Sequence, residues 1–229
     1  LSSFGNTITH PKHHWRVSLY SPMNNGNFLS DNSPPDRWEM MKNLWKIKYE
    51  PWRKSDQDDP ILFVLQPKDN WSMNELDPVK WFMDVYEKIR PITDRQFLIR
   101  PHPNHMAHIE ERMNEFPEDC KVLIGQKFFS GDEKKFYRFN FQEAIANCHA
   151  VITHNSTASI DSCVRGIPTF VTSDLAICWD VANKNLNNIE TPEYPDREQW
   201  VYDIGYKQWT EEEIRNGTVF KRFKEKLGY

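Results

Sequence analysis

The sequence predicts an α/β fold with a mostly parallel sheet, because short apolar segments with β propensity alternate with segments of helical periodicity. Residues 150–171 show this alternation most clearly. The apolar run 150–152 predicts a buried strand, and after a polar turn Ile160, Cys163 and Val164 recur at the i, i+3, i+4 spacing of a helix. Gly166 and Pro168 then predict the end of this helix and a second strand.

The other elements follow in the same way. Asp77 and Pro78 predict an N-cap and first helical residue, followed by a helix that buries Phe82, Val85, Tyr86 and Ile89. Thr210 predicts the start of the last helix through a capping box with Glu213. The expected strands are 15–20, 61–65, 97–100, 122–124, 150–153 and 168–172, and the other expected helices are 106–116, 139–148, 157–165, 196–206 and 210–227.

A polar segment at residues 55–60 predicts a boundary between two parts of the chain. We expect residues 1–57 to form a reduced N-terminal segment. Residues 58–229 are expected to form a Rossmann-like domain with C-terminal helices.

Composition is typical of a soluble globular enzyme, since 38% of the 229 residues are hydrophobic and 27% are charged. No apolar run approaches the ~20 residues of a membrane span, so a cytoplasmic location is the expectation. The net charge of −4 argues against a simple nucleic-acid-binding protein. The four cysteines are widely spaced and are expected to be reduced and to pack as small apolar residues.

The turn at residues 154–157 is the first candidate site, because it joins a predicted strand to a predicted helix. Ser156 or Thr157 is expected to cap the helix, and the unpaired backbone N–H groups of the first turn would then face a bound phosphate. Ligands of open α/β sheets bind at the carboxyl ends of strands. The alternative is an ordinary turn that caps a helix and binds nothing.

A second candidate follows the strand that ends at Arg100. Two prolines stiffen the next residues, so Arg100, His102 and Asn104 are expected in a rigid loop at the carboxyl end of that strand. Arginine and histidine side chains suit a nucleotide diphosphate, because both donate hydrogen bonds to phosphate oxygens. Packing of His102 between the prolines is the alternative. We expect this loop and the 154–157 turn to come from neighbouring strands and to grip one pyrophosphate.

Three segments together resemble a known family: Arg-Pro-His-Pro, Thr-His-Asn-Ser-Thr-Ala-Ser-Ile-Asp, and Gly-Ile-Pro-Thr-Phe-Val. They look like the donor-binding half of GT-B glycosyltransferases, especially polysaccharide and Kdo-type transferases. Asn-Gly-Asn-Phe, Ser-Pro-Pro-Asp-Arg-Trp and Pro-Asp-Arg-Glu-Gln-Trp further resemble small bacteriophage glycosyltransferases. The resemblance covers residues 15–225. It implies glycosyl transfer and a GT-B-like fold in which residues 1–57 are a reduced acceptor-side segment and residues 58–229 are the nucleotide-sugar-binding domain. It also implies that the sugar nucleotide is held by Arg100, His102, His154, Asn155, Ser156 and Thr157.

Further candidates surround this donor site. Asp161, one turn into the helix, is placed to accept a sugar or ribose hydroxyl, although a carboxylate there also complements the helix dipole. Arg197 is a candidate for contact with the diphosphate. On the acceptor side the candidates are Asn25 and Asn27 in a turn, Arg37, and as catalytic base Asp31, Asp36 or His14. For Asp36 a helix-capping role is the alternative, and for His13 and His14 a surface position near the chain end.

The expected chemistry is metal-independent, because GT-B enzymes generally stabilise the leaving nucleotide with helix dipoles and basic side chains. The chain is expected to lack an Asp-x-Asp metal signature, because Asp58 and Asp59 are adjacent in a linker, and no metal or cofactor is expected. The acceptor is either a hydroxylated base in phage DNA or a cell-surface glycan, and a homodimer is compatible with the sequence. The alternatives are a non-catalytic sugar-nucleotide or glycan-binding module and a protein related to nucleotide-sugar epimerases.

Overall fold

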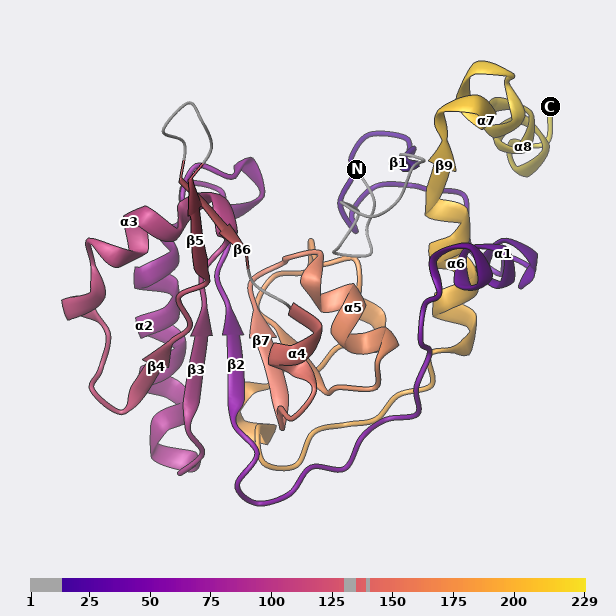
Figure 1. The fold of residues 1–229 in the computed structure, drawn as a ribbon. Coiled ribbons are helices and arrows are strands. Elements are labelled where there is room, and N and C mark those ends of the chain that lie inside the picture. Colours follow the sequence, from indigo (N-terminus) through magenta and orange to yellow (C-terminus); the bar gives the residue numbers. More distant parts are fainter. Residues whose placement is uncertain (1–13, 130–134, 139–140) are drawn as a thin grey trace.

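The protein is built around a five-stranded parallel sheet with the strand order β4-β3-β2-β7-β8 (Figure 1). The structure, a computed structural model, describes residues 14–129, 135–138 and 141–229. The α/β class predicted from the sequence is confirmed. The strands of this sheet are β2 (Ile61–Val64), β3 (Phe97–Arg100), β4 (Cys120–Val122), β7 (Ala150–Thr153) and β8 (Thr169–Val171).

Strand β2 lies at the centre of the sheet, and all four of its residues are buried. Its register places Val64 opposite Arg100 of β3 and opposite Thr153 of β7. The last residues of three strands therefore form one row. The loops that follow these strands emerge at the end of the sheet where the strands have their carboxyl ends. This end of the sheet is here called the carboxyl rim.

Helices cover both faces of the sheet. Helix α2 (Pro78–Ile89) and helix α3 (Met106–Glu110) pack on the face that carries Phe63 and Ile152. Helix α4 (Phe141–Ile145) and the first residue of α5 (Ala158–Val164) pack on the opposite face, against Leu62 and Val151. These two clusters bury the apolar strand residues on both sides, as expected for a parallel sheet.

Two helix boundaries agree with the sequence signals. The Asp77 carboxylate accepts hydrogen bonds from the backbone N–H groups of Val79 and Lys80, and Pro78 is the first residue of α2. Gly166 ends α5 with φ of +73°, a backbone conformation that favours glycine.

The ends of the chain form a second region beside the sheet (Figure 1). Strand β1 (His14–Arg16) pairs antiparallel with β9 (Gln208–Thr210), and helix α1 (Asp36–Trp45) packs on α6 (Glu198–Lys207). The expected strand 15–20 is thus only three residues long in the structure. The expected helix 210–227 is divided into α7 (Glu211–Arg215) and α8 (Thr218–Leu227), because Gly217 adopts φ of +82° between them.

From residue 14 onward, the N-terminal segment packs into apolar clusters that it shares with the rest of the chain. Trp38, Met41 and Trp45 of α1 share one apolar cluster with Ile160 of α5 and with Trp200 of α6. The linker 46–60 then runs beside residues 184–197, where the Trp52 indole donates to the carbonyl of Pro195. The boundary expected near residue 57 is therefore a linker between regions that share a core.

Several short elements complete the fold and were not expected. A hairpin of β5 (Gln126–Phe129) and β6 (Lys135–Arg138) follows β4. The helices expected at 106–116 and 139–148 are shorter in the structure, and residues 139 and 140 lie outside the described part. Short 3₁₀ helices occur at Trp71–Met73, Arg90–Ile92, Pro103–His105, Met113–Glu115, Trp179–Val181 and Leu186–Asn188.

Candidate functional site

The two candidate loops emerge from the carboxyl rim. Arg100 ends β3, and His154 follows β7, so both loops lie on one edge of the sheet. The expectation that β3 and β7 are neighbours is wrong, because β2 lies between them. With neighbouring strands about 4.8 Å apart, Arg100 and Thr153 are separated by roughly 10 Å at their Cα atoms.

Arg100 and Asp161 are electrostatically coupled across this rim. Burial lowers the pKa of Arg100 to about 10, and the negative charge of Asp161 opposes that change. Burial raises the pKa of Asp161 to about 7, against the opposing charges of Arg165 and Arg100. The Arg100 guanidinium carbon also lies 4.9 Å from the centre of the Phe141 ring. The rim therefore holds a half-buried cation that is coupled to a carboxyl group with a raised pKa.

His102 is a neutral side chain at the rim. Its Nδ1 accepts a hydrogen bond of 3.3 Å from the backbone N–H of Asn104, so the ring proton lies on Nε2. Burial, helped by the charges of Arg100 and His105, lowers its pKa to about 4. The Asn104 side chain is exposed in the same loop. The proline-flanked segment thus presents a neutral imidazole next to a cation.

Asn155 is held inside the rim. Its backbone N–H donates to Gln66 Oε1 (2.9 Å), its Oδ1 accepts from Gln66 Nε2 (2.8 Å), and its Nδ2 donates to the carbonyl of Ser72 (2.7 Å). Both Asn155 and Gln66 are buried. Asn155 therefore joins the loop after β7 to the loop after β2. Gln66 was missed in the sequence, although a polar residue directly after an apolar strand is the signal that could have found it.

Ser156 and Thr157 lead into helix α5, which has only seven residues. Thr157 is the N-cap residue, but its side chain makes no capping hydrogen bond. The Ser156 hydroxyl instead accepts from the backbone N–H of Ala158 at 3.3 Å. Because α5 is this short, the helix dipole expected at this turn arises from only seven residues.

His154 belongs to a small cluster that the sequence did not reveal. Its Nδ1 lies 2.9 Å from the hydroxyl of Thr172, the residue after β8. The same hydroxyl accepts from Trp81 Nε1 of α2 at 2.8 Å. Burial lowers the pKa of His154. Thr172 also follows an apolar strand directly, so the signal that applies to Gln66 applies here.

The N-terminal turn reaches the rim near the end of β8. The backbone N–H of Asn24 donates to the carbonyl of Leu175, and its side chain donates to the carbonyl of Asp174, both at 3.1 Å. Asn25 is exposed in this turn, and the Asn27 side chain accepts from the backbone N–H of Leu29. These contacts bring two acceptor-side candidates next to the loop that carries Thr172.

The three candidate bases differ in burial and in hydrogen bonding. The carboxylate of Asp36 accepts from the Tyr206 hydroxyl at 2.8 Å, so the expected capping role is wrong, and Pro35 is the N-cap residue. His14 is fully buried, with its ring 4.5 Å from the Trp45 ring, so the expected surface position is wrong. His13 lies outside the described residues. Asp31 is exposed, and its carbonyl accepts from Lys226.

Two arginines expected at the ligand stabilise the packing of helices instead. Arg37 is buried, forms an ion pair with Glu213 of α7, and donates to the carbonyls of Gly205 and Gln208. Arg197 is buried and donates to the carbonyls of Cys163 and Glu50. Their donors are directed into the protein and not toward the rim.

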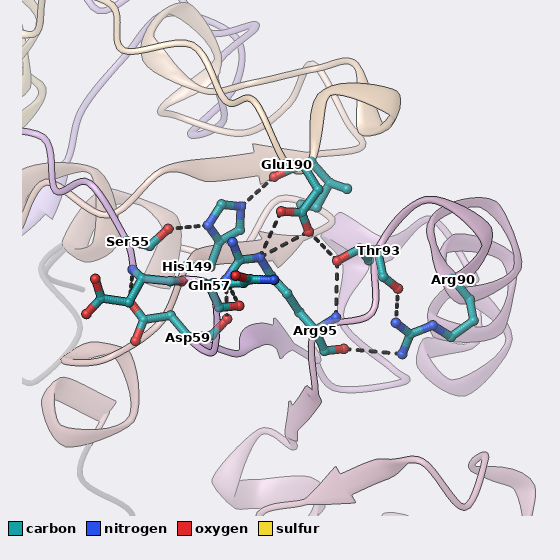
Figure 2. Close-up of polar contacts among 10 residues, drawn as sticks. Ser55, Gln57, Asp59, Arg90, Thr93, Arg95, His149 and Glu190 are labelled. Carbon is teal, nitrogen blue, oxygen red and sulfur yellow. Dashed lines mark hydrogen bonds and ion pairs between the residues drawn. The ribbon is translucent and has the colours of Figure 1, made fainter.

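The opposite end of the sheet, at the amino ends of the strands, carries a dense polar cluster, which Figure 2 shows. Arg95 donates to the backbone carbonyls of Asp56, Gln57 and Asp59 at 2.7 to 2.9 Å, and it forms an ion pair with Glu190. Backbone carbonyls of the linker thus accept hydrogen bonds from the Arg95 guanidinium. The cluster therefore attaches the linker to the amino end of the sheet.

His149 lies in the same cluster. Its Nε2 donates to the carbonyl of Ile189 at 2.6 Å, and its Nδ1 contacts the Ser55 hydroxyl (Figure 2). The expectation that the chain lacks an Asp-x-Asp signature is wrong, because Asp56, Gln57 and Asp58 have this spacing; they lie at this end of the sheet, away from the rim. Within the described residues, no group of three or more His, Cys, Asp or Glu side chains is arranged to hold a metal ion.

The sheet and its two helical layers define a Rossmann-like α/β fold that is GT-B-like. Two similar solved structures are from Thermosulfurimonas dismutans. KpsC, beta Kdo 2,4 transferase, has a TM-score of 0.56 at 11% identity, covering 94% of this chain and 76% of its own. KpsC, beta Kdo 2,7 transferase, has a TM-score of 0.50 at 11% identity, with coverages of 90% and 70%.

No protein-family model matches the sequence, and no curated protein matches it. The structural similarity thus establishes the fold. Of the helices within the described ranges, none has both the length and the apolar character required to span a bilayer.

Proposed function

We propose that the chain is a glycosyltransferase that binds a sugar nucleotide at the carboxyl rim. The observation that carries this proposal is that Arg100 and His102 at the end of β3, and His154 and Asp161 after β7, lie at the same carboxyl rim, where Arg100 and Asp161 are electrostatically coupled. Ligands of open parallel sheets bind at this edge. The names of the two similar structures, both Kdo transferases, support the same class of reaction.

The proposed roles follow from charge and protonation. Arg100 stabilises the negative charge that develops on the leaving nucleotide phosphate. His102 and His154 are neutral at pH 7 and donate hydrogen bonds to phosphate oxygens. Asp161 accepts from a sugar or ribose hydroxyl, and Ser156, Thr157 and Asn104 line the same rim. Asn155 acts indirectly, since its side chain positions the loop.

On the acceptor side, the turn that contains Asn25 and Asn27 borders the rim and approaches the acceptor hydroxyl. Asp31 is the proposed base, because Asp36 is bonded to Tyr206 and His14 is fully buried. The proposed acceptor is either a glycan or a hydroxymethylated DNA base. Transfer is proposed to need no metal.

The test is release of free nucleotide from a panel of nucleoside monophosphate and diphosphate sugars, with glycan acceptors, with hydroxymethylated DNA, and without acceptor. Arg100→Ala is expected to lower turnover at least 100-fold, the scale of a lost contact to a developing charge. Arg215→Ala, which removes an exposed arginine of α7, is the matched control and should keep the wild-type rate.

Unchanged turnover in Arg100→Ala would overturn the donor site, and loss of turnover in EDTA would overturn metal independence. A non-catalytic binding module is the second candidate, because Arg37, Asp36 and His14 are engaged in packing and not at the rim. Donor binding by calorimetry without turnover on any acceptor would favour the module.

A further inference from the structure

The Thr172 hydroxyl joins three elements at the rim. Thr172 follows β8, Trp81 belongs to α2, and His154 follows β7. Trp81 Nε1 donates to Thr172 Oγ1 at 2.8 Å, and His154 Nδ1 lies 2.9 Å from the same oxygen. The Trp81 and His154 rings also pack edge to face, with centroids 6.3 Å apart.

The donors and acceptors in this cluster can be counted. An indole N–H only donates, so Trp81 occupies one lone pair of Thr172 Oγ1. The hydroxyl has a single hydrogen, and Nδ1 of a neutral imidazole accepts when the proton lies on Nε2. If Thr172 donates to His154 Nδ1, all three groups are satisfied without solvent. With a proton on Nδ1, both neighbours would donate to Oγ1 and the hydroxyl hydrogen would need another acceptor.

Trp81 gives this arrangement its rigidity. Its side chain is only 4% exposed, and its ring packs against Phe63 of the central strand. The direction of its N–H bond is therefore set by the core of the protein. Burial lowers the pKa of His154, which keeps the imidazole neutral at pH 7.

His102 also accepts a hydrogen bond at Nδ1, but from a different donor. There a backbone N–H, from Asn104, occupies Nδ1 and leaves the proton on Nε2. The two rim histidines would thus have the same tautomer. Since the two ring nitrogens point in diverging directions, each Nε2–H bond is directed away from the group that occupies Nδ1.

We propose that Trp81 and Thr172 are positioning residues that hold His154 as the Nε2–H tautomer, so that this N–H donates to a phosphate oxygen of the bound sugar nucleotide. The role toward a phosphate rests on the proposed function. The tautomer itself does not, and it can be measured on the free protein.

The first experiment is nitrogen-15 NMR of histidine-labelled full-length protein near pH 8, with His154→Gln used to assign the signals. In the wild type, Nδ1 of His154 should resonate as an unprotonated nitrogen that accepts a hydrogen bond. Thr172→Val should move this signal toward that of a free imidazole, whereas Thr172→Ser should keep it. Thr172 is exposed, so these variants leave the core intact. A protonated Nδ1 in the wild type, or the same signal in Thr172→Val, would overturn the proposal.

The second experiment measures kcat/KM for the donor. Thr172→Val and Trp81→Phe should each lower it by about 10- to 100-fold, as expected when a hydrogen bond to a charged group is weakened. Thr172→Ser should restore the wild-type value. Thr191→Val and Trp15→Phe, at exposed sites away from the rim, are the matched controls. Full activity in both rim variants overturns the positioning role. Absence of turnover in the wild type instead refutes the proposed function, and the NMR result still decides the tautomer.

Discussion

Single side chains at the carboxyl rim differ in how burial affects their charge. Asp161 becomes harder to ionise, while His102 and His154 become harder to protonate. Near neutral pH the rim therefore combines two neutral imidazoles and a carboxyl group close to its titration point with the cation of Arg100. Such a site has a net preference for an anion.

The carboxyl group of Asp161 gives a pH-dependent prediction. Its pKa is about 7 in the folded chain, against an ordinary value of 3.8, so between these values the folded state retains a proton that the unfolded state has released. The stability contributed by this group is complete below pH 3.8 and is lost as the pH rises through about 7. Asp161→Asn should therefore raise the free energy of unfolding at pH 8 by more than about 1 kcal/mol.

The measurement is urea denaturation of both proteins between pH 4 and pH 8. The gain should shrink toward zero as the pH falls, because protonated aspartate and asparagine then carry the same charge. Asp58→Asn, at an exposed linker position, is the control and should give no pH-dependent difference. A gain that is the same at every pH would contradict the assigned cause.

Elements with strong local signals were predictable. The central strands agree with prediction to within a few residues, because each is a short apolar run. The start of α2 agrees because Asp77 caps it, and the capping box of Thr210 and Glu213 is present. Helix α1 was anticipated only through the capping role considered for Asp36, although Trp38, Met41 and Trp45 also have helical spacing. Strand β9 depends on pairing with the distant β1, which no local pattern encodes.

The candidate site was predictable to a similar extent. Polar residues placed directly after apolar strands, such as Arg100 and His154, do lie at one rim. The strand order, which separates them by β2, comes from tertiary packing. Arg37 was misassigned because sequence cannot distinguish an arginine that binds a ligand from one that binds the carbonyls of a distant helix.

The turn between α5 and β8 gives a prediction about backbone geometry. Gly166 has φ of +73°, and an added Cβ would lie 1.9 Å from the backbone oxygen of Pro51. Gly166→Ala should therefore lower the free energy of unfolding for two reasons. The left-handed backbone conformation costs an alanine about 1–2 kcal/mol, and the linker must be displaced to make room for the Cβ atom. Gly217→Ala is the matched control, because φ is +82° there and nothing lies within 4 Å.

Thermal and urea denaturation of the two glycine variants provide the comparison. Gly166→Ala should be less stable than Gly217→Ala by about 1 kcal/mol or more, which is the contribution of the clash alone. Equal losses would mean that the linker moves freely and does not pack on the turn.

The molecule as a whole is held together by contacts between segments far apart in sequence. Helices α1 and α6 share an apolar cluster with α5, and Arg197 connects the linker to the end of α5. Neither the first 57 residues nor the rest of the chain can bury this surface alone.

We therefore expect one cooperative unfolding transition for the whole chain. In differential scanning calorimetry, the calorimetric and van't Hoff enthalpies should agree. A fragment of residues 58–229 should aggregate or bind a dye for exposed apolar surface, because it would expose the surface of α5 and α6 that α1 covers. Two separate transitions, or a stable fragment, would show independent domains.

The edges of the sheet also bear on behaviour at high concentration. The outer side of β8 is already occupied, since Asn183 exchanges backbone hydrogen bonds with Thr169 and Val171. The other edge strand, β4, has only three residues, and its Lys121 is exposed. A short edge with a lysine is a poor template for pairing with another chain. The parallel sheet, though apolar on both faces, is thereby protected from polymerising edge to edge.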